Sequence, residues 1–578
     1  MVSSAVSIVV GQGTELRQAT ASERAGQASS AGRMTALPTI SPRQLFLRVP
    51  PFPGARLSGF AEVSCADASL DGIGERLREL RVGGTYWAAQ PRLPHDPYVV
   101  VTSSAAVEAA VRLADRNPVV LWDRAGHSGH GNYGTFVVTG ECDPWHMLAN
   151  ATKLIGGGDD QLRLIAALLN IPVYEVDETT GEAWRAPTDV EGLIASEFDG
   201  TAFENPFTGE LMSALEAIEL CGFWRRLIDS NRDLGGALGF AFWKQSHVAP
   251  LLWNGSAPVQ FLRGDGRQIS DKRIAVWRAK AAPESVAELE RAGARLVEVE
   301  DGFIRSRGLG ADCIPPLSIT VDALAPHFDP SRPSELELLL QNGEFDAPTL
   351  ARARELRRLI VSAGLGKYGQ GNAAVERPAG DRRHILVPGQ VEDDRAVQSG
   401  GCGLVSNLQL LKRVREQAPD AYILYKPHPD VLAGHRRGAI AERECLEYAD
   451  EVVGELPISS LIGMVDEVHV NTSLAGFEAL LREKAVTTYG VPFYAGWGLT
   501  RDLGPVPSRR TTVRILDEMV AAALLIYPRY LDPATGLPCP AEVVVARLSA
   551  AEEGDPGLVV AMRRLQGKFM RRLRSLVQ

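Results

Sequence analysis

Residues 467–500, EVHVNTSLAGFEALLREKAVTTYGVPFYAGWGLT, have the pattern of a strand, a turn, a helix, a second strand and a loop. Residues 467–471 alternate and carry two valines, which favours a β-strand, and Ser473 stands where a helix N-cap is expected. A helix that opens directly after a parallel strand presents unpaired N–H groups and the positive end of its dipole, and phosphate is the usual ligand there. The stretch therefore predicts an α/β fold with an anion site at Thr472 and Ser473.

Glu478 lies about one turn inside the predicted helix and is poorly explained as a core residue. Beside an anion site, its carboxylate can accept hydrogen bonds from a ribose diol. The alternative is an ordinary βαβ unit with a solvated glutamate, and this stretch alone leaves both interpretations open. The aromatic, glycine-rich loop that follows contains Tyr494 and Trp497.

Length and composition indicate a soluble globular protein of two to four domains. The chain has 578 residues, with 45% hydrophobic and 23% charged residues and a net charge of −10, which argues against a nucleic-acid binder. No uninterrupted apolar span of about 18 residues is present, so no transmembrane helix is expected, and no secretory signal is recognised. The seven scattered cysteines form no CxxC pair, which favours a reducing cytosol.

Polar residues follow four predicted strands. Glu300 and Asp301 come after residues 295–299, the sequence QVEDD (390–394) after 384–387, and KPHPD (426–430) after 422–425; the Thr472 turn is the fourth. Open α/β sheets place their sites at these carboxyl ends. For Glu300 and Asp301 a structural role remains open, with Asp301 capping a helix and paired with Arg305. The four signals together predict a functional site.

The N-terminal part reads as a tail and a partial repeat. Residues 1–40 are predicted to be a disordered tail, and 41–235 to be an α/β module. Asn205–Gly209 (NPFTG) recurs as Asp532–Gly536 (DPATG), and the helical pattern at 162–169 echoes that at 474–481, without the glutamate. We interpret this module as a degenerate copy of a later one, with chance similarity as the alternative. His127, His130 and His146 match no metal-ligand spacing, so no metal site is expected.

Residues from about 270 to 540 resemble bacterial capsule enzymes of the KpsC type, which are β-Kdo transferases that build the poly-Kdo linker between lipid and capsular polysaccharide. The resemblance favours the C-terminal transferase module of that tandem enzyme. The motifs that carry it are EDGFIRS (300–306), LGADCIPPLS (309–318), LVPGQVEDD (386–394), YKPHPDVLAG (425–434), TSLAGFEALL (472–481) and GVPFYAGWGLT (490–500).

The resemblance implies a GT-B fold, in which two Rossmann-like halves hold the donor CMP-Kdo in the cleft between them. The acceptor-side half is expected at 240–375 and the CMP-sugar half at 380–550. The chain departs from the family in two places. The family's Ser-Lys-Tyr-Asn is here Gly366-Lys367-Tyr368-Gly369, and the N-terminal part has no EDGF, QVEDD or KPHP of its own. One active site is therefore expected.

The resemblance also implies transfer with retention of the β configuration, which by double displacement requires a nucleophilic carboxylate and a second carboxyl group about 5 Å away. We assign Asp394 as nucleophile, with Asp393 as second candidate, and Glu300 as acid/base. Asp301 and Arg305 orient it or meet the sugar carboxylate. The nucleotide is assigned to Lys426, His428, Pro429, Thr472, Ser473 and Glu478, and the substrate further to Gln390, Lys367, Tyr494 and Trp497.

No cofactor or metal is expected, because a CMP-sugar leaves with a single phosphodiester charge that Lys426, His428 and the helix N-terminus can stabilise. Two other functions remain open. One is a transferase for another nucleotide sugar, such as CMP-sialic acid; the other is a non-catalytic capsule assembly or export factor. The complete set of Glu300, Asp394, His428 and Glu478 argues against the second.

Residues 556–578 form a predicted basic amphipathic tail. Its last 17 residues contain six basic residues and no acidic one, and apolar residues recur at three- and four-residue steps. Such a helix suits an anionic membrane surface. We expect a cytoplasmic protein that can contact the inner face of the inner membrane, where a glycolipid acceptor would lie. The alternative is a helix folded against the acidic body of the protein.

Overall fold

The computed structural model describes residues 45–550 of the 578-residue chain, apart from short gaps. The gaps are residues 67, 96, 126–134, 157–158, 178, 263–271, 307–312, 368, 371–375, 379, 435 and 455. The predicted tails 1–40 and 556–578 lie outside the described residues, as do His127 and His130. Within the described ranges, no helix is both long and apolar enough to cross a membrane.

The stretch that begins at Glu467 lies in a six-stranded parallel sheet of order β19-β18-β17-β20-β21-β22. The chain runs outward from β17 to β19 and then returns to the other side of β17, so the strand order reverses between β17 and β20. Ligands bind at the carboxyl ends of strands at such a point. The strands are β17 (His384–Pro388), β18 (Tyr422–Lys426), β19 (Glu451–Val452), β20 (Glu467–Val470), β21 (Ala485–Thr488) and β22 (Arg501–Asp502).

A second, seven-stranded sheet has the order β11-β10-β12-β13-β14-β23-β24. Its first four strands are parallel, and the last three pair antiparallel. The chain leaves this sheet after β14, builds the six-stranded sheet and returns to it as β23. The strands are β10 (Leu234–Leu238), β11 (Phe261–Leu262), β12 (Arg273–Val276), β13 (Arg295–Asp301), β14 (Ser318–Asp322), β23 (Pro528–Leu531) and β24 (Pro538–Cys539).

Helices cover both sheets where the sequence predicts them. The helix predicted after Ser473 is α16, and the Ser473 hydroxyl oxygen accepts the Ala475 N–H at 3.2 Å as its cap. The helices of these two halves that matter below are α7 (Phe242–Leu252), α8 (Pro283–Arg291), α9 (Glu335–Asn342), α10 (Ala347–Ser362), α11 (Arg395–Gly400), α12 (Asn407–Gln417), α13 (Pro429–Leu432), α15 (Ile458–Met464), α16 (Leu474–Leu481), α17 (Leu516–Val520) and α18 (Ala541–Ala550).

The N-terminal module contains a six-stranded sheet of order β4-β3-β2-β5-β6-β7. Strand by strand this order repeats that of the C-terminal sheet, with β2 in the place of β17 and β5 in the place of β20. The edge strand β7 differs, because it is antiparallel to β6. The strands are β2 (Tyr98–Val101), β3 (Val119–Asp123), β4 (Phe136–Thr139), β5 (Ala151–Ile155), β6 (Val173–Val176) and β7 (Ala183–Arg185), covered by helices that include α2 (Val107–Leu113), α4 (Asp160–Leu168) and α5 (Val190–Phe198).

The repeated pentapeptides form the same turn. Residues 205–209 connect β8 (Thr201–Glu204) to β9 (Leu211–Met212), and residues 532–536 connect β23 to β24. In each turn the glycine N–H donates to the carbonyl of the first residue at 2.9 Å, and the glycine has a positive φ. A helix follows each hairpin, α6 (Ala214–Asp229) and α18. The shared strand order and the shared turn agree with the interpretation of the module as a degenerate copy, which stays a prediction.

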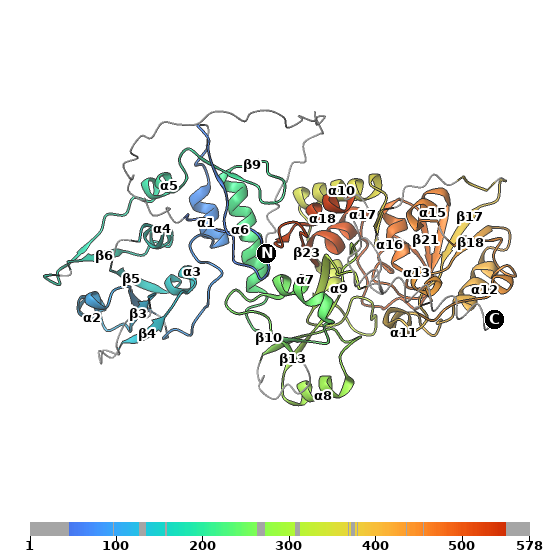
Figure 1. The fold of residues 1–578 in the computed structure, drawn as a ribbon, viewed down its shortest axis with the longest axis horizontal. Helices are drawn as coiled ribbons and strands as arrows, with labels where there is room; N and C mark the ends of the chain where they lie inside the picture. Colours follow the sequence, from blue (N-terminus) through green and yellow to red (C-terminus); the bar gives the residue numbers. More distant parts are fainter. Residues whose placement is uncertain are drawn as a thin grey trace, which may run out of the picture.

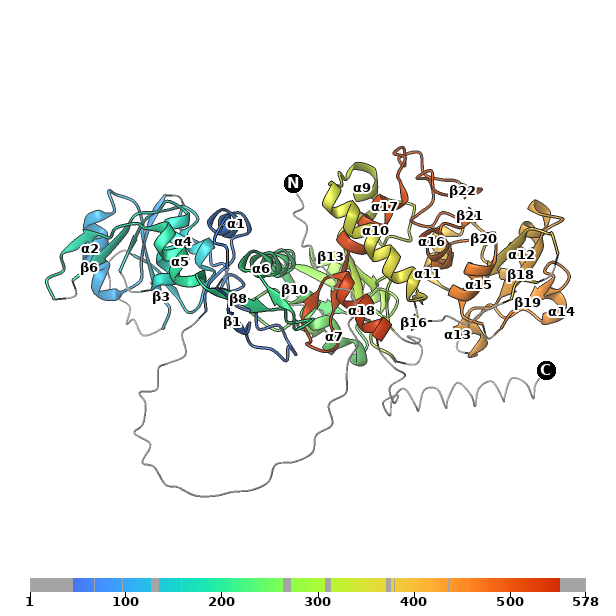
Figure 2. The same cartoon turned by 90° about the horizontal axis from the view of Figure 1, so that it is seen from above.

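The two larger sheets and their helices form the GT-B-like pair of Rossmann-like halves, which confirms the predicted α/β fold class. The three six- and seven-stranded sheets lie in a row, with the N-terminal module at one end and the half that carries α16 at the other (Figure 1, Figure 2). The long helix α6 stands between the module and the seven-stranded sheet (Figure 2). The Trp224 indole N–H on α6 donates to the Pro538 carbonyl at 2.8 Å, which joins the two copies.

Two helical glycines predict opposite effects of alanine on stability. A Cβ at Gly476 in α16 would lie 2.2 Å from the Tyr494 hydroxyl oxygen, whereas one at Gly463 in α15 would meet no atom within 4 Å. Gly476→Ala is expected to lower the free energy of unfolding by about 1–3 kcal/mol through overpacking. Gly463→Ala is expected to raise it by up to about 1 kcal/mol through helix propensity. Chemical denaturation of both variants checks this, and equal effects would contradict the packing around α16.

Candidate active site

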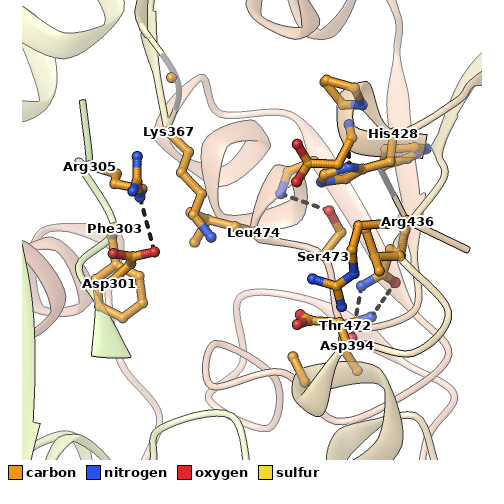
Figure 3. Close-up of a pocket in the computed structure, with 18 of the residues that line it drawn as sticks. Asp301, Phe303, Arg305, Lys367, Asp394, His428, Arg436, Thr472, Ser473 and Leu474 are labelled. Atoms are coloured by element: carbon orange, nitrogen blue, oxygen red, sulfur yellow. Dashed lines mark hydrogen bonds and ion pairs between the residues drawn. The ribbon is translucent and has the colours of Figure 1, made fainter. Parts of the chain in front are cut away.

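A cleft of about 890 Å³ lies between the two halves, at the carboxyl ends of their strands. In Figure 3, Asp301 and Arg305 from the seven-stranded half face His428, Ser473 and Asp394 from the other half, with Lys367 between them. The cleft brings together twelve of the fifteen residues assigned from the sequence: Glu300, Asp301, Arg305, Lys367, Gln390, Asp394, Lys426, His428, Pro429, Thr472, Ser473 and Glu478.

Glu300 and Asp301 end strand β13 and have opposite electrostatic settings. Lys244 Nζ lies 3.2 Å from one Asp301 carboxylate oxygen, and Arg305 Nε lies 2.9 Å from the other. These cations outweigh burial and hold the pKa of Asp301 at about 2. Glu300 is dominated by burial, which raises its pKa to about 7 against the opposing charge of Arg395. One carboxylate is therefore permanently ionised, and its neighbour can exchange a proton near neutral pH.

Arg305 was predicted to orient an acid or to meet a sugar carboxylate. The structure commits its guanidinium to protein groups. Besides Asp301, it donates to the Ser306 hydroxyl at 2.6 Å and to the Ile314 carbonyl at 2.8 Å, and the residue is 1% exposed. Asp301 ends a strand and caps no helix among the described residues. The alternative interpretation is therefore confirmed for the ion pair with Arg305 and not for the helix cap.

The opposite wall is built by the N-terminus of α16. The Gln390 side chain accepts the Thr472 N–H at 3.0 Å and donates to the Thr472 hydroxyl at 2.9 Å, which ties the end of β17 to the end of β20. The Ser473 carbonyl accepts the Tyr494 hydroxyl. The turn before the helix is therefore held from both sides, with the positive end of α16 directed at the cleft.

Lys426 and His428 follow β18 and line the cleft. The Lys426 ammonium donates to the Gly454 carbonyl at 3.0 Å. Burial lowers the pKa of His428 to about 4, helped by Lys367, Arg436 and Lys426, so this imidazole adds no positive charge near neutral pH. Its Nδ1 accepts the Asp430 N–H at 3.1 Å, so the neutral ring carries its proton on Nε2. The imidazole is a neutral hydrogen-bond donor.

Glu478 is buried in the cleft wall, which excludes the solvated alternative. One carboxylate oxygen accepts the Lys367 N–H at 2.8 Å, and the other is buried without a hydrogen-bond partner in the described structure. Burial raises the pKa of this glutamate. A Cβ at Gly366 would lie 2.9 Å from the unpartnered oxygen. Glycine in place of the family's serine therefore leaves space beside this oxygen, which can still accept a hydrogen bond.

Asp394 and Asp393 are placed differently. Asp394 lines the cleft at the start of α11, is exposed, and makes no capping bond with its side chain. Asp393 does not line the cleft; its carboxylate lies 3.3 Å from Arg436 on the rim. The structure thus separates two candidates that the sequence could not rank firmly. Asp394 directly precedes Arg395, whose guanidinium contacts Glu300 of the opposite half.

Tyr494 and Trp497 were assigned to the substrate, and the structure places both outside the cleft lining. Each is fully buried. The Tyr494 hydroxyl supports the turn before α16, and the Trp497 indole N–H donates to the Phe493 carbonyl at 2.8 Å. Tyr494 stacks on Phe477 of α16, and the Arg510 guanidinium lies over the Trp497 ring. Pro492 and Phe493 are the residues of this loop that line the cleft.

The cleft residues that sequence analysis missed include the basic side chains Lys244, His327, Arg395 and Arg436. Lys244 precedes the stretch that resembles the family. Arg395 directly follows QVEDD, and Arg436 follows YKPHPDVLAG by one residue, so extending these motifs would have found both. No sequence motif marks His327, because its place in the cleft is set by tertiary packing. Its ring packs against Phe303 and Phe493, and burial lowers its pKa to about 3.

The N-terminal copy has lost the anion position. Asp159 caps α4 in the place of Ser473, and its carboxylate accepts the N–H groups of Gln161 and Leu162 at 3.1 and 3.3 Å. Arg124, which follows β3, contacts the same carboxylate. The protein's own aspartate thus fills the position of a phosphate. His146 bonds the Pro91 carbonyl, and among the described residues no three His, Cys, Asp or Glu side chains gather into a metal site.

Comparisons with known proteins agree with this geometry. A family model described as "Capsule polysaccharide biosynthesis protein" matches residues 365–530. The chain is 38% identical over 357 residues to the capsule polysaccharide modification protein LipA of Neisseria meningitidis serogroup A, covering 61% of this chain and 50% of LipA. Residues 365–530 thus match the capsule polysaccharide biosynthesis family.

Other similar proteins show how much of the chain is matched. The lipopolysaccharide-processing protein LpsZ of Rhizobium meliloti is 43% identical over 265 residues, which cover 45% of this chain and 60% of LpsZ. The solved structure "KpsC, beta Kdo 2,7 transferase" of Thermosulfurimonas dismutans is 35% identical and covers 55% of this chain and 98% of that chain, with a TM-score of 0.45. The resemblance to the KpsC type is confirmed. The chain spans only 50–60% of the length of these curated relatives.

The high pKa of Glu300 predicts that a neutral residue at this position raises the stability of the fold, by an amount that depends on pH. Its pKa is about 7 in the folded protein and 4.5 in the reference state, so the folded state holds its proton more tightly and stability falls as pH rises between these values. As pH rises from 4.5 to 8, the free energy of unfolding of Glu300→Gln is therefore expected to increase by about 2–3 kcal/mol relative to that of wild type. Thermal unfolding at several pH values measures this. Glu284→Gln, on an exposed helix, is the control, and a pH-independent difference for Glu300→Gln would contradict the burial argument.

Proposed function

We propose that the chain is a glycosyltransferase that moves Kdo from CMP-Kdo to a lipid-linked Kdo or glycolipid acceptor in the biosynthesis of a capsule linker, with retention of the β configuration. The observation that carries the proposal is the cleft, in which the N-terminus of α16 and the unpartnered oxygen of Glu478 face the carboxylates of β13. The match of residues 365–530 to the capsule family model and the 35% sequence identity to a protein titled a Kdo transferase support it.

The nucleotide is assigned to the half that carries α16. The phosphate of CMP would lie at the Thr472 and Ser473 turn, where backbone N–H groups and the helix dipole favour an anion. Lys426 adds a positive charge, and neutral His428 donates a hydrogen bond from Nε2. Glu478 would accept a ribose hydroxyl with the oxygen that has no partner in the described structure. A singly charged phosphodiester needs no metal in this arrangement, and no cofactor is proposed.

The reacting groups are assigned to both halves. Asp394 is proposed as the nucleophile, because its exposed carboxylate is not engaged by the described residues, whereas both oxygens of Asp301 are held by cations. Attack on the anomeric carbon breaks its bond to the phosphate oxygen, and CMP leaves. Glu300 then takes the proton of the acceptor hydroxyl, whose oxygen displaces the Asp394 carboxylate. Its pKa near 7 suits that step.

A donor screen by mass spectrometry tests the proposed function. The purified protein is incubated with CMP-Kdo, CMP-sialic acid and other nucleotide sugars, each with Kdo-terminated and lipid-linked acceptors. A product mass increased by one Kdo residue, formed only from CMP-Kdo, is expected. Transfer from another donor would replace the assigned sugar, and no transfer from any donor would favour a non-catalytic assembly or export factor.

Asp394→Asn is expected to reduce transfer by at least about a thousandfold while leaving CMP affinity within about twofold of wild type, because the nucleophile acts on the sugar. Turnover and isothermal calorimetry measure the two effects. Asp393→Asn, one residue away on the rim, is the matched control and should retain most of the activity. An Asp394→Asn protein with wild-type turnover would show that the nucleophile is another residue.

Peripheral membrane contact through residues 562–578 is proposed for delivery of a lipid-linked acceptor; this segment lies outside the described residues. Flotation with anionic liposomes is expected for the full chain at low salt, and to weaken at high salt because screening shortens the reach of the charges. A chain that ends at Val560 should float much less. Equal flotation of both chains would exclude the tail as the anchor.

A further inference from the structure

Arg395 connects the two halves across the cleft. It is the first residue of α11, on the half that carries the anion site, and its partners lie on β13 of the other half. One guanidinium nitrogen donates to Glu300 Oε1 at 2.6 Å, and another donates to Glu298 Oε2 at 3.1 Å. The guanidinium also lies 5.0 Å from the ring centre of Phe328. The side chain is thus held in one place by three groups of the opposite half.

The charges around Glu300 explain why its contact with Arg395 affects its ionisation. Asp301 and Glu298, on the same strand, oppose its ionisation, and Lys244 on α7 favours it from the far side of Asp301. Among the described cations, Arg395 alone makes an ion pair with Glu300. Glu298 is also paired with Arg278 at 2.6 Å, so it keeps a partner of its own half when Arg395 is absent.

We propose that Arg395 is a positioning residue that makes the base role of Glu300 depend on contact between the two halves. This inference rests on the proposed function, in which Glu300 takes a proton from the acceptor hydroxyl. A glutamate that is already protonated cannot take that proton. When the halves separate, Arg395 withdraws, and the negative charges of Asp301 and Glu298 on the same strand then favour the protonated acid. Glu300 is thus ionised and able to accept the proton only when the nucleotide half is in contact with it.

The pH dependence of transfer tests the proposal. The acid limb of kcat/KM for the acceptor reports the free enzyme's base. Arg395→Gln should move this limb upward by about one pH unit, so that activity falls about fivefold at pH 7 and largely recovers at pH 9. Arg395→Lys should keep the limb close to that of wild type because it retains the charge. Arg278→Gln removes a similar charge from Glu298 and is the matched control, with an unmoved limb.

A direct titration separates this inference from the proposed function. The side-chain carboxyl of Glu300 is followed by carbon-13 NMR and assigned by its loss in Glu300→Gln. Its titration should move to higher pH in Arg395→Gln and not in Arg278→Gln. An unmoved titration, or an activity loss equal at every pH, would overturn the role of Arg395. Absence of transfer in wild type would instead refute the proposed function, and the titration would still decide whether Arg395 controls Glu300.

Discussion

The pairing of β14 with β23 is the contact on which the arrangement of the two halves depends. Strand β23 follows the whole six-stranded sheet in the chain, yet it pairs with β14 in the first half, with Ser318 opposite Tyr530. Just before β23, the buried Tyr527 hydroxyl donates to Asp322 at 2.9 Å. The second half is therefore tied to the first at both of its ends. This double connection keeps the carboxyl ends of the two sheets facing each other, which is the condition for a shared cleft.

The cleft divides the chemistry between the halves. One half offers a helix N-terminus, a lysine, a neutral histidine and a carboxylate oxygen in need of a donor, which together suit a nucleotide. The other offers two adjacent carboxyl groups whose pKa values are driven apart, to about 2 at Asp301 and about 7 at Glu300. Their separation follows from simple electrostatics, because Asp301 meets two cations and Glu300 meets one. Such a pair can keep one charge fixed while the other group moves a proton.

Local signals in the sequence predicted much of the fold and most of the cleft. Strand ends, the Ser473 cap and the turn at residues 205–209 were all readable, because they depend on neighbours in the chain. Properties set by tertiary packing were not. Tyr494 and Trp497 have the composition of a binding loop but are fully buried, and burial keeps His428 neutral near pH 7. Lys244 and Arg395 act through partners more than 50 residues away. The strand order that the N-terminal module shares with the C-terminal sheet could not be predicted from single motifs either.

Hydrogen–deuterium exchange with and without CMP tests the central claim most directly, namely that the cleft and not the N-terminal copy holds the nucleotide. The account predicts slower exchange at 426–430 and 472–478 on addition of CMP, with no change in strands β2, β3 and β5. Protection of the N-terminal sheet, around the aspartate-filled position at Asp159, would contradict it.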